Sequence, residues 1–286
     1  MGETLSGKKV AGEVIPELTA ECKKLLDRGL TPKLVIVRFG ANPDDLFYEK
    51  GARKTCGQVG IAVDAHELPP DADTAALLRV VGELNNDPSV NGILLMQPFP
   101  KHIDVQAVRT KIAPAKDIDG MSPFNEAKVY ENDPTGFPPC TPTAVMEILK
   151  NYRIELKGKN AVVLGRSTVV GKPVAMLLLG EHATVTICHS RTTDLAGVAR
   201  QGDILVAAIG KAKMITGGYV KPGAVVIDVG INVDMNGKMC GDVDFDSAAP
   251  VAGMITPVPG GVGSVTTTVL AKHVLRAAAA QAGAKA

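Results

Sequence analysis

Apolar runs and amphipathic stretches alternate along the first half of the chain. The run Lys33–Phe39 predicts a strand, and the alternating segment Ile61–Glu67 predicts a second strand with one exposed face. Gly92–Met96 is a short apolar run that predicts a third strand, which ends before Pro98. Helices are predicted over residues 44–59, 73–84 and 103–112. Strands that alternate with helices are typical of a parallel α/β layer.

The second half of the chain repeats this alternation. Its apolar runs predict strands over residues 161–164, 183–188, 203–208 and 224–229, with helices over residues 172–179 and 265–280. Residues 117–142 contain five prolines and predict a long connection between the halves, followed by a helix over residues 143–152. A connection of that length is expected to have a function. The chain is therefore predicted to be an α/β protein of two domains.

A glycine turn follows the first strand of the second half. It runs from Gly165 through Arg166 and Ser167 to Gly171, and a helix begins near Pro173. Such a turn aims free backbone N–H groups and a helix dipole at one point, which suits a phosphate group. The middle glycine of the usual G-x-G-x-x-G pattern is absent, so an ordinary strand-to-helix turn is the alternative.

The residues after the next strand indicate which nucleotide would bind. A domain selective for NAD usually places a carboxylate there for the ribose hydroxyls. This chain has Ser190 and Arg191 instead, and Arg166 adds a second guanidinium from the glycine turn. Two guanidiniums favour a 2′-phosphate, and therefore NADP over NAD. The alternative is that both arginines are solvated surface charges.

Composition excludes several classes of function. The chain has 286 residues, of which 45% are hydrophobic and 21% charged, and its net charge of +1 indicates no nucleic-acid or anionic-membrane surface. No apolar run is long enough for a membrane span. The five scattered cysteines are expected to be buried thiols in a reducing cytoplasm, and the five histidines have no metal-ligand spacing, so no metal is predicted. With 3% aromatic residues and no Trp, the core is expected to be aliphatic.

Several local sequences resemble one family. They are Lys116–Gly120, Pro139–Pro142, Gly165–Pro173, Val226–Asn232, Gly241–Val243 and Thr256–Gly263. In this order they resemble the methylenetetrahydrofolate dehydrogenase/cyclohydrolase family over nearly the whole chain. The resemblance implies two α/β domains around a cleft, with a Rossmann-like NADP-binding parallel sheet in residues 143–264. The folate-binding domain would comprise residues 1–142 and a returning C-terminal helix, residues 265–286. It also implies a homodimer paired through the nucleotide domain.

The resemblance implies a two-step chemistry of one-carbon metabolism. A hydride passes from 5,10-methylenetetrahydrofolate to NADP and leaves the methenyl cation. A cyclohydrolase step then adds water and opens the ring to 10-formyltetrahydrofolate.

The resemblance also assigns residues to these steps. Tyr48 packs over the folate, and Asp119 of the K-D-x-D-G motif holds the pterin. The folate pocket is shaped by the loop that contains Pro259, Gly260, Gly261 and Val262. The resemblance implies that NADP is bound by Gly165, Arg166, Ser167, Ser190 and Ile231. We add Gly171, because it belongs to the glycine turn, and Arg191, because it is the second guanidinium.

One departure from the family pattern concerns an amine. The family has Tyr-x-x-x-Lys, whereas Ala52 stands four residues after Tyr48 here. At 100° per residue, Lys50 lies about 200°, Arg53 about 140° and Lys54 about 240° around the helix from Tyr48. None of the three shares the face of Tyr48, so we expect the family's lysine to have no substitute.

A second departure concerns an amide. The family's strand end Val-Gln-Leu-Pro-Leu-Pro has its glutamine where this chain has Met96, and Gln97 is displaced by one residue. On a strand, that offset places Gln97 on the opposite face, unless the turn at Pro98 re-aims it. Hydride transfer needs positioning, whereas hydration needs acid–base groups. We therefore predict an NADP-dependent dehydrogenase with weak or absent cyclohydrolase activity.

Other polar residues have structural alternatives. Asp45 shares the helix face of Tyr48 and is either a pocket carboxylate or a helix cap beside Asp44. Asp228 is interpreted as an aspartate that caps backbone groups. Cys140 has no base partner for a nucleophile and is interpreted as a packing residue or a neighbour of the cofactor. Two further functions stay open: a folate- or NADP-binding protein without turnover, and an NADP dehydrogenase that acts on another small acid.

Overall fold

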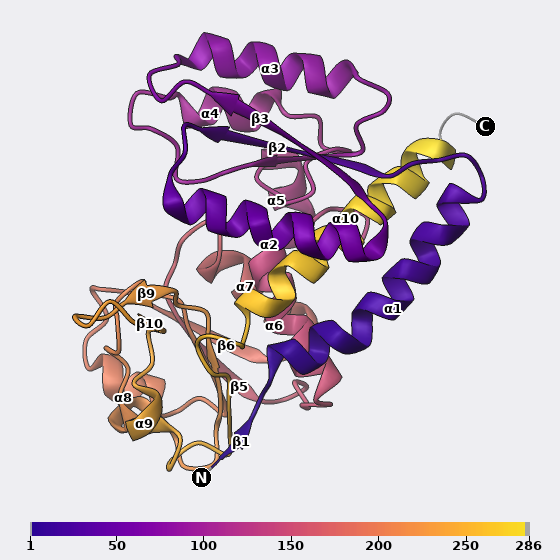
Figure 1. Ribbon diagram of the computed structural model, residues 1–286. Coiled ribbons are helices and arrows are strands. Elements are labelled where there is room, and N and C mark those ends of the chain that lie inside the picture. Colours follow the sequence, from indigo (N-terminus) through magenta and orange to yellow (C-terminus); the bar gives the residue numbers. More distant parts are fainter. Residues whose placement is uncertain (1, 284–286) are drawn as a thin grey trace. The chain divides into compact units, whose positions relative to one another are not determined.

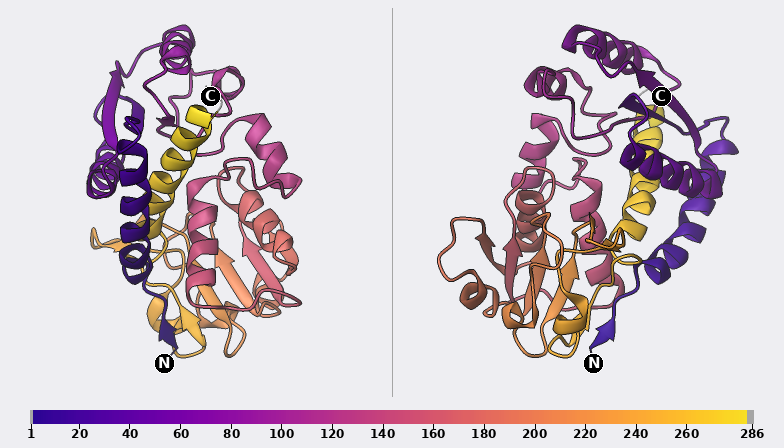
Figure 2. Two further views of the ribbon diagram at one scale, coloured as in Figure 1. Left: turned by 90° about the vertical axis from the view of Figure 1, so that its right-hand side faces the viewer. Right: turned by 60° about the vertical axis from the view of Figure 1, so that its left-hand side comes forward.

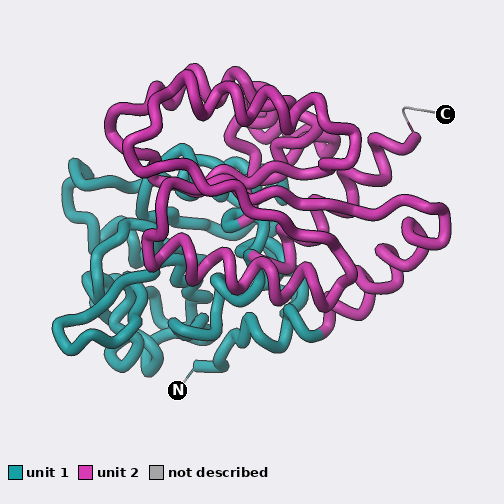
Figure 3. The backbone as a smooth tube through the Cα atoms, turned by 45° about the horizontal axis from the view of Figure 1, so that its top comes forward, with its two compact units in different colours: residues 1–12, 141–266 teal, residues 13–140, 267–286 magenta. Residues whose placement is uncertain are grey.

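A computed structural model describes residues 2–283 (Figure 1). The chain divides into two compact units, which are coloured separately in Figure 3. Unit 1 comprises residues 1–12 and 141–266, and unit 2 comprises residues 13–140 and 267–286. The ends of the predicted folate-binding domain, residue 1 and residues 284–286, lie outside the described residues.

Unit 2 is built on a three-stranded parallel sheet of order β3-β2-β4. The strands are β2 (Lys33–Phe39), β3 (Ala62–Leu68) and β4 (Gly92–Leu95). The helices are α2 (Pro43–Val59), α3 (Thr74–Asn86), α4 (Val105–Lys111) and α5 (Pro123–Tyr130), together with parts of α1 (Gly7–Leu26) and α10 (Gly263–Gly283). The strands and helices predicted for residues 33–112 are confirmed to within a few residues.

Alternation along β2 gives the sheet two buried faces. Val35 and Val37 belong to an aliphatic core with residues of α3 and α4. On the other face lie α2 and α10 (Figures 1 and 2), which contact each other where the hydroxyls of Thr55 and Thr267 are 2.9 Å apart. A Cβ atom at Gly92 would lie 3.1 Å from Val274 of α10, so glycine lets this helix approach the strand.

Unit 1 is built on a six-stranded parallel sheet of order β1-β11-β8-β7-β5-β6. Its strands are β1 (Glu3–Thr4), β5 (Asn160–Leu164), β6 (Thr184–Cys188), β7 (Ile204–Ala207), β8 (Val225–Asp228) and β11 (Met254–Ile255). An antiparallel hairpin follows β8 and consists of β9 (Asn232–Val233) and β10 (Met239–Cys240). The helices are α6 (Cys140–Asn151), α7 (Gly171–Gly180), α8 (Leu195–Ala199), the 3-10 turn η1 (Gly217–Tyr219) and α9 (Phe245–Ala248). A parallel sheet of this kind confirms the predicted Rossmann-like arrangement.

The first residues of the chain belong to unit 1, in contrast to their predicted place in the folate-binding domain. Strand β1 pairs with β11, with Glu3 opposite Met254 and Thr4 opposite Ile255. These two-residue strands leave no periodic signal in the sequence. Only their pairing across the length of the chain reveals the assignment.

Four α-helices were missing from the sequence prediction, namely α1, α5 and the short helices α8 and α9. Helix α1 contains Pro16, which reads as a helix breaker. Helix α5 lies inside the segment predicted as a long connection. It begins at Pro123, and the hydroxyl of Ser122 accepts a hydrogen bond from the N–H of Asn125 (3.2 Å). Proline in a first turn starts a helix rather than ending one, which is why the proline count was misleading.

Candidate functional site

Helix α2 carries Tyr48, the residue predicted to pack over the substrate. Asn42 caps this helix, because its side chain accepts a hydrogen bond from the N–H of Asp44 (3.0 Å). The Tyr48 side chain is half-buried. Burial, followed by the neighbouring acidic groups of Cys140 and Asp119, raises the pKa of the Tyr48 hydroxyl well above its usual value. Tyr48 is therefore a neutral phenol that can donate a hydrogen bond and offer an aromatic face.

Asp119 lies in a turn that its neighbours fix. Asp117 is 1% exposed and accepts hydrogen bonds from the N–H groups of Met121 (3.0 Å) and Ser122 (2.8 Å). Gly120 has a φ of +63°, and a Cβ atom there would lie 2.1 Å from a backbone carbonyl oxygen. The turn therefore requires glycine after Asp119.

The Asp119 carboxylate lies near Tyr48. Its Oδ1 accepts a hydrogen bond from the N–H of Cys140 (2.8 Å). Burial raises the pKa of Asp119 to about 6, although the hydrogen bond from Cys140 acts in the opposite direction. Unit 2 thus brings together the two residues that the sequence predicted as its substrate contacts, one from α2 and one from the turn before α5.

His273 of α10 supports the same turn, and sequence reasoning missed it. Its side chain is 4% exposed, and its Nδ1–H donates a hydrogen bond to the carbonyl oxygen of Ile118 (2.8 Å). Burial lowers the pKa of His273 to about 3, so the imidazole is neutral. The Cys140 sulfur lies 3.8 Å from the same Nδ1, and burial raises the pKa of this thiol well above its usual value. Cys140 is a packing residue rather than a nucleophile.

Position 52 is closed to solvent. Ala52 is 0% exposed and has no group that can move a proton. Lys50 and Lys54 are exposed side chains. Arg53 turns toward β3, because its guanidinium donates hydrogen bonds to Glu49 (2.7 Å) and to a backbone carbonyl of β3 (2.7 Å). Arg53 therefore does not share the helix face of Tyr48, as the helix geometry predicted.

Position 96 is buried and apolar like position 52, whereas position 97 is exposed. Met96 is 8% exposed, and its N–H donates a hydrogen bond to Val37 of β2 (2.9 Å). Gln97 follows the end of β4 and is exposed. The amide of Gln97 therefore does not occupy the buried place of the Met96 side chain.

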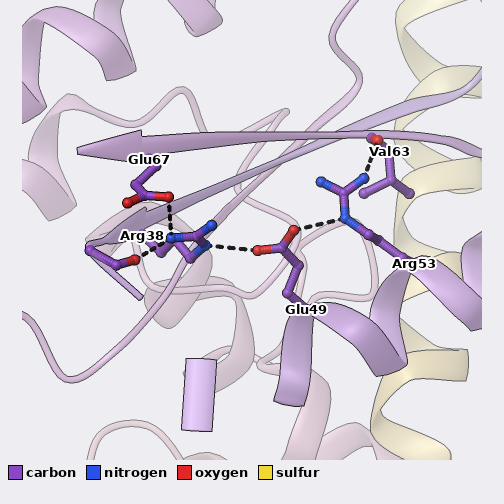
Figure 4. Close-up of polar contacts among 6 residues, drawn as sticks. Arg38, Glu49, Arg53, Val63 and Glu67 are labelled. Carbon is purple, nitrogen blue, oxygen red and sulfur yellow. Dashed lines mark hydrogen bonds and ion pairs between the residues drawn. The ribbon is translucent and has the colours of Figure 1, made fainter. Parts of the chain in front are cut away.

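A chain of ion pairs includes Glu49, which follows Tyr48 in the sequence of α2 (Figure 4). The Arg38 guanidinium contacts Glu49 (2.8 Å) and Glu67 (2.8 Å), and the other oxygen of Glu49 contacts Arg53 (2.7 Å). The side chains of Arg38 and Glu49 are each 11% exposed. Burial acts to raise the pKa of Glu49, but hydrogen bonds from both arginines outweigh it and hold this pKa below its usual value. These contacts join β2, β3 and α2.

Asp45 lies near the same guanidinium. Burial and then Asp44 raise the pKa of Asp45, whereas Arg38 lowers it. The alternative that Asp45 caps the helix is wrong, because Asn42 has that role.

The glycine turn of unit 1 brings backbone segments very close together. Gly165 has a φ of +129°, and a Cβ atom there would lie 2.1 Å from the carbonyl oxygen of Ala208. A Cβ atom at Gly171 would lie 2.3 Å from the carbonyl oxygen of Gly165. The hydroxyl of Ser167 accepts hydrogen bonds from the N–H groups of Val170 (3.1 Å) and Gly171 (3.3 Å). These two N–H groups at the start of α7, which the sequence predicted to be free for a phosphate, are therefore already bonded to Ser167.

The hydrogen-bond donors that stay free in this region lie in the glycine turn and in the turn after β6. Within residues 2–283, the N–H groups of Thr168 and Val169 donate no hydrogen bond. Arg166, Ser190 and Arg191 are exposed, and neither arginine takes part in an ion pair of the described chain. Because β5 and β6 are adjacent and parallel, both turns lie at the same edge of the sheet. This edge offers free donors and positive charge, which fits a phosphorylated dinucleotide.

Two further predicted segments of unit 1 adjoin each other. Ile231 follows β8 and is 67% exposed, and a Cβ atom at Gly263 would lie 3.7 Å from its side chain. Gly263 ends the glycine loop that contains Pro259–Val262. Gly260 has a φ of +104°, and a Cβ atom at Gly261 would lie 2.4 Å from a backbone carbonyl. The loop conformation therefore depends on its glycines.

Neither a metal site nor a membrane-spanning helix is present among the described residues. In the part of the chain that the structure describes, no three His, Cys, Asp or Glu side chains are grouped so that they could hold a metal ion. None of the helices in residues 2–283 combines the length and the apolar character needed to cross a membrane.

Two family models match the chain. Residues 5–119 match the tetrahydrofolate dehydrogenase/cyclohydrolase catalytic domain, and residues 139–282 match the NAD(P)-binding domain of the same family. The chain belongs to the tetrahydrofolate dehydrogenase/cyclohydrolase family. This membership confirms the resemblance found in the sequence, and the glycine turn lies in the NAD(P)-binding domain.

Curated relatives in this family match the chain over nearly their full length. The chain is 56% identical over 276 residues to the bifunctional protein FolD of Clostridioides difficile, covering 96% of each chain. It is also 56% identical over 279 residues to the bifunctional protein FolD of Carboxydothermus hydrogenoformans, covering 97% of each chain.

Solved structures of the family have the same fold. The bifunctional enzyme FolD of Campylobacter jejuni has a TM-score of 0.95 and 38% identity, with 98% of this chain and 99% of that chain covered. The methylenetetrahydrofolate dehydrogenase-cyclohydrolase of Trypanosoma brucei, solved with NADP and an inhibitor, has a TM-score of 0.93 and 38% identity, with 98% of both chains covered. The NAD-dependent dehydrogenase of Saccharomyces cerevisiae, at 22% identity and a TM-score of 0.83, shows the fold alone.

Proposed function

We propose that this chain oxidises 5,10-methylenetetrahydrofolate to 5,10-methenyltetrahydrofolate with NADP, and that its cyclohydrolase activity is weak or absent. Family membership supports the first part. The second part depends on one observation, which is that Ala52 is fully buried where the family pattern has a lysine.

The dehydrogenase step needs little acid–base chemistry from the protein. NADP, when bound, supplies the hydride acceptor. Asp119, which is ionised above about pH 6, would accept hydrogen bonds from the N–H groups of the pterin. Tyr48, a neutral phenol, would pack its ring against the folate. Substrate contacts are assigned to Pro259, Gly260, Gly261 and Val262 on the family resemblance.

The cyclohydrolase step has different needs. Addition of water and opening of the ring require groups that move protons, and loss of such a group costs about 10²–10⁴-fold in rate. Ala52 and Met96 are both buried and apolar. Arg53 is bound to Glu49 and β3. Hydride transfer therefore survives these substitutions better than hydration does.

The preference for NADP over NAD follows from the charge at the edge of unit 1. Two exposed guanidiniums, those of Arg166 and Arg191, stand with Ser190 in the adjacent turns after β5 and β6. Gly165, Ser167, Gly171 and Ile231 complete the proposed cofactor contacts. No carboxylate stands where it would repel a 2′-phosphate after β6.

The test follows both reactions in one sample. NADPH formation from methylenetetrahydrofolate measures the dehydrogenase, and the decay of methenyl absorbance measures the cyclohydrolase. We expect NADPH formation with methenyl accumulation. As matched controls, Lys50→Ala and Lys54→Ala remove exposed lysines of the same helix and should change neither rate. Fast methenyl hydrolysis in the unaltered protein, abolished by either control, would show that a neighbouring amine replaces the lysine.

The same assay separates the other candidate functions. Tight folate binding without turnover would indicate a binding protein, and turnover with another small acid alone would indicate a different dehydrogenase. Homodimer formation and a cytoplasmic location stay predictions. Sedimentation equilibrium of the full chain tests the first.

A further inference from the structure

Asp242 is a buried carboxylate held by backbone and amide donors. It is 0% exposed. Its Oδ2 accepts hydrogen bonds from the N–H groups of Ile209 (2.6 Å) and Gly210 (3.0 Å). Its Oδ1 accepts hydrogen bonds from the N–H of Lys211 (2.8 Å) and from the side-chain amide of Asn232 (2.9 Å). None of the ion pairs among the described residues includes Asp242.

The groups that Asp242 holds come from two neighbouring loops. Residues 209–211 follow the end of β7 at Ala207, and Asn232 follows the end of β8 at Asp228. Strands β7 and β8 are adjacent and parallel, so both loops leave the sheet at its carboxyl edge. Ligands of open parallel sheets bind outside that edge. Ile231, a proposed cofactor contact, directly precedes Asn232.

A second aspartate holds Asp242 in place. Asp228 is 3% exposed and accepts hydrogen bonds from the N–H groups of Asp242 (3.0 Å), Gly230 (3.0 Å) and Val243 (2.9 Å). This confirms its interpretation as a backbone-capping residue. The N–H of Asp228 donates to the hydroxyl of Thr256 (2.7 Å), which follows β11. The contacts therefore continue from the loops after β7 and β8 to the start of the glycine loop.

Two glycines make room for these carboxylates. A Cβ atom at Gly230 would lie 2.4 Å from the Asp242 carboxyl carbon, and one at Gly241 would lie 1.8 Å from an Asp228 oxygen. Any other residue at either position would push a carboxylate away from its donors. The Gly241–Val243 segment and the Val226–Asn232 segment are thus one interlocking unit, which explains why both belong to the family's pattern.

We infer that Asp242 is a positioning residue for NADP, which sets the loops after β7 and β8 in the conformation that the cofactor needs. This inference rests on the proposed cofactor. The Asp242 side chain is itself buried, so it acts through Ile231 and residues 209–211 rather than by touching the ligand.

The test is titration of the full chain with NADP alone, combined with steady-state kinetics. Asp242→Asn keeps the size of the side chain but replaces one accepting oxygen by an NH2 group that faces N–H donors. We expect the dissociation constant and the Michaelis constant for NADP to rise about 10- to 100-fold. The Michaelis constant for the folate substrate should rise less than that for NADP, because two of its proposed contacts, Tyr48 and Asp119, belong to unit 2.

Asp203 offers a matched control in the same sheet. It directly precedes β7, at the opposite edge, where it accepts a hydrogen bond from the N–H of Asn160 (2.9 Å) and an ion pair from Lys221 (2.6 Å). Asp203→Asn should leave NADP binding unchanged. If Asp242→Asn fails to fold, Asn232→Ala removes one of the four contacts and should raise the NADP dissociation constant severalfold.

Three results would overturn the inference. They are unchanged NADP binding in folded Asp242→Asn and Asn232→Ala proteins, an equal loss in Asp203→Asn, or an equal rise in both Michaelis constants. NADP binding by the unaltered protein without turnover on methylenetetrahydrofolate would defeat the proposed function and leave the binding comparison to decide the inference. Failure of the unaltered protein to bind NADP would overturn both.

Discussion

In unit 1 the buried carboxylates of Asp228 and Asp242 accept hydrogen bonds mainly from backbone N–H groups. In unit 2 the buried carboxylate of Glu49 lies between the guanidiniums of Arg38 and Arg53. The first arrangement shapes loops at the edge of a sheet, whereas the second fastens a helix to two strands. A charge that backbone groups solvate leaves side chains such as Arg166 and Arg191 free for a ligand. The Glu49 carboxylate, in contrast, is paired with the guanidiniums of Arg38 and Arg53, so both of these cations are engaged within the fold.

The largest effect is expected when the family's lysine and glutamine are restored, which tests whether their absence limits cyclohydrolase activity. Ala52→Lys combined with Met96→Gln should raise cyclohydrolase activity about 10²–10⁴-fold, because it supplies a group that can move protons. Dehydrogenase activity should stay within a few-fold. The decay of methenyl absorbance measures the gain.

Position 52 is buried, so a longer side chain could act by shape alone. Ala52→Met with Met96→Gln has nearly the same length without the amine and should show no gain. A folded lysine variant without added hydrolysis would contradict the proposal that position 52 limits the cyclohydrolase activity.

The ion pair between Arg38 and Glu49 should contribute to stability because each buried charge needs the other as its partner. Glu49→Leu leaves the Arg38 guanidinium without its buried carboxylate partner and should lower the free energy of unfolding by about 3 kcal/mol. Urea denaturation measures this loss.

The double variant Arg38→Met with Glu49→Leu removes both charges and should recover most of that stability. Additive losses in the double variant would show that the two side chains do not depend on each other. Glu67 pairs with the same guanidinium from a 53% exposed position, so Glu67→Gln should have a smaller effect.

The free cations of unit 1 should determine cofactor choice. Arg166→Ala with Arg191→Ala should weaken NADP binding about 10- to 100-fold and leave NAD binding nearly unchanged. Arg200→Ala is the control, because its guanidinium donates to the carbonyl of Gly218 instead. An equal loss of NAD and NADP affinity would indicate that the arginines support the fold rather than the 2′-phosphate.

The smallest expected effect is a pH dependence in unit 2. Because the pKa of Asp119 is raised to about 6, its carboxylate form is lost as pH falls through that value. The kcat/KM for the folate substrate should fall about tenfold per unit below pH 6. The sign for stability is the opposite, since a raised carboxyl pKa contributes stability below its unfolded value and loses it as pH rises through 6. In Asp119→Asn the inflection near pH 6 should disappear, and its persistence would assign the titration to another group.

Much of the fold follows from local patterns. The apolar run of β2, the alternation in β3 and the aspartate caps of α3 and α4 can be read from neighbouring residues. The structure has these elements where they were predicted. Helix α1 could not be read this way, because Gly12 and Pro16 interrupt its pattern and its packing is decided by distant residues. Strands β1 and β11 have two residues each, and they are defined by their pairing with each other and by the pairing of β11 with β8.

In the candidate site, too, the residues found from the sequence stand in local motifs, and the residues missed act through distant contacts. Motifs located Tyr48, Asp119 and the Gly165 turn, since each stands in a short recognisable segment. His273 stabilises the Asp119 turn through a carbonyl 155 residues away, and no spacing rule reveals such a contact. The Arg38–Glu49 pair was also invisible, because it joins a strand end to a helix face.

Helix α10 has a consequence for the order in which the protein is made. Its residues 267–283 complete unit 2, through Val274 against Gly92 and His273 against Ile118, yet they are synthesised after all of unit 1. Unit 1 ends at residue 266, so its sheet is fully synthesised earlier. The three-stranded sheet of unit 2 is therefore synthesised before that of unit 1 is complete, but it is covered only later. The nascent chain carries an open apolar sheet face until α10 emerges from the ribosome.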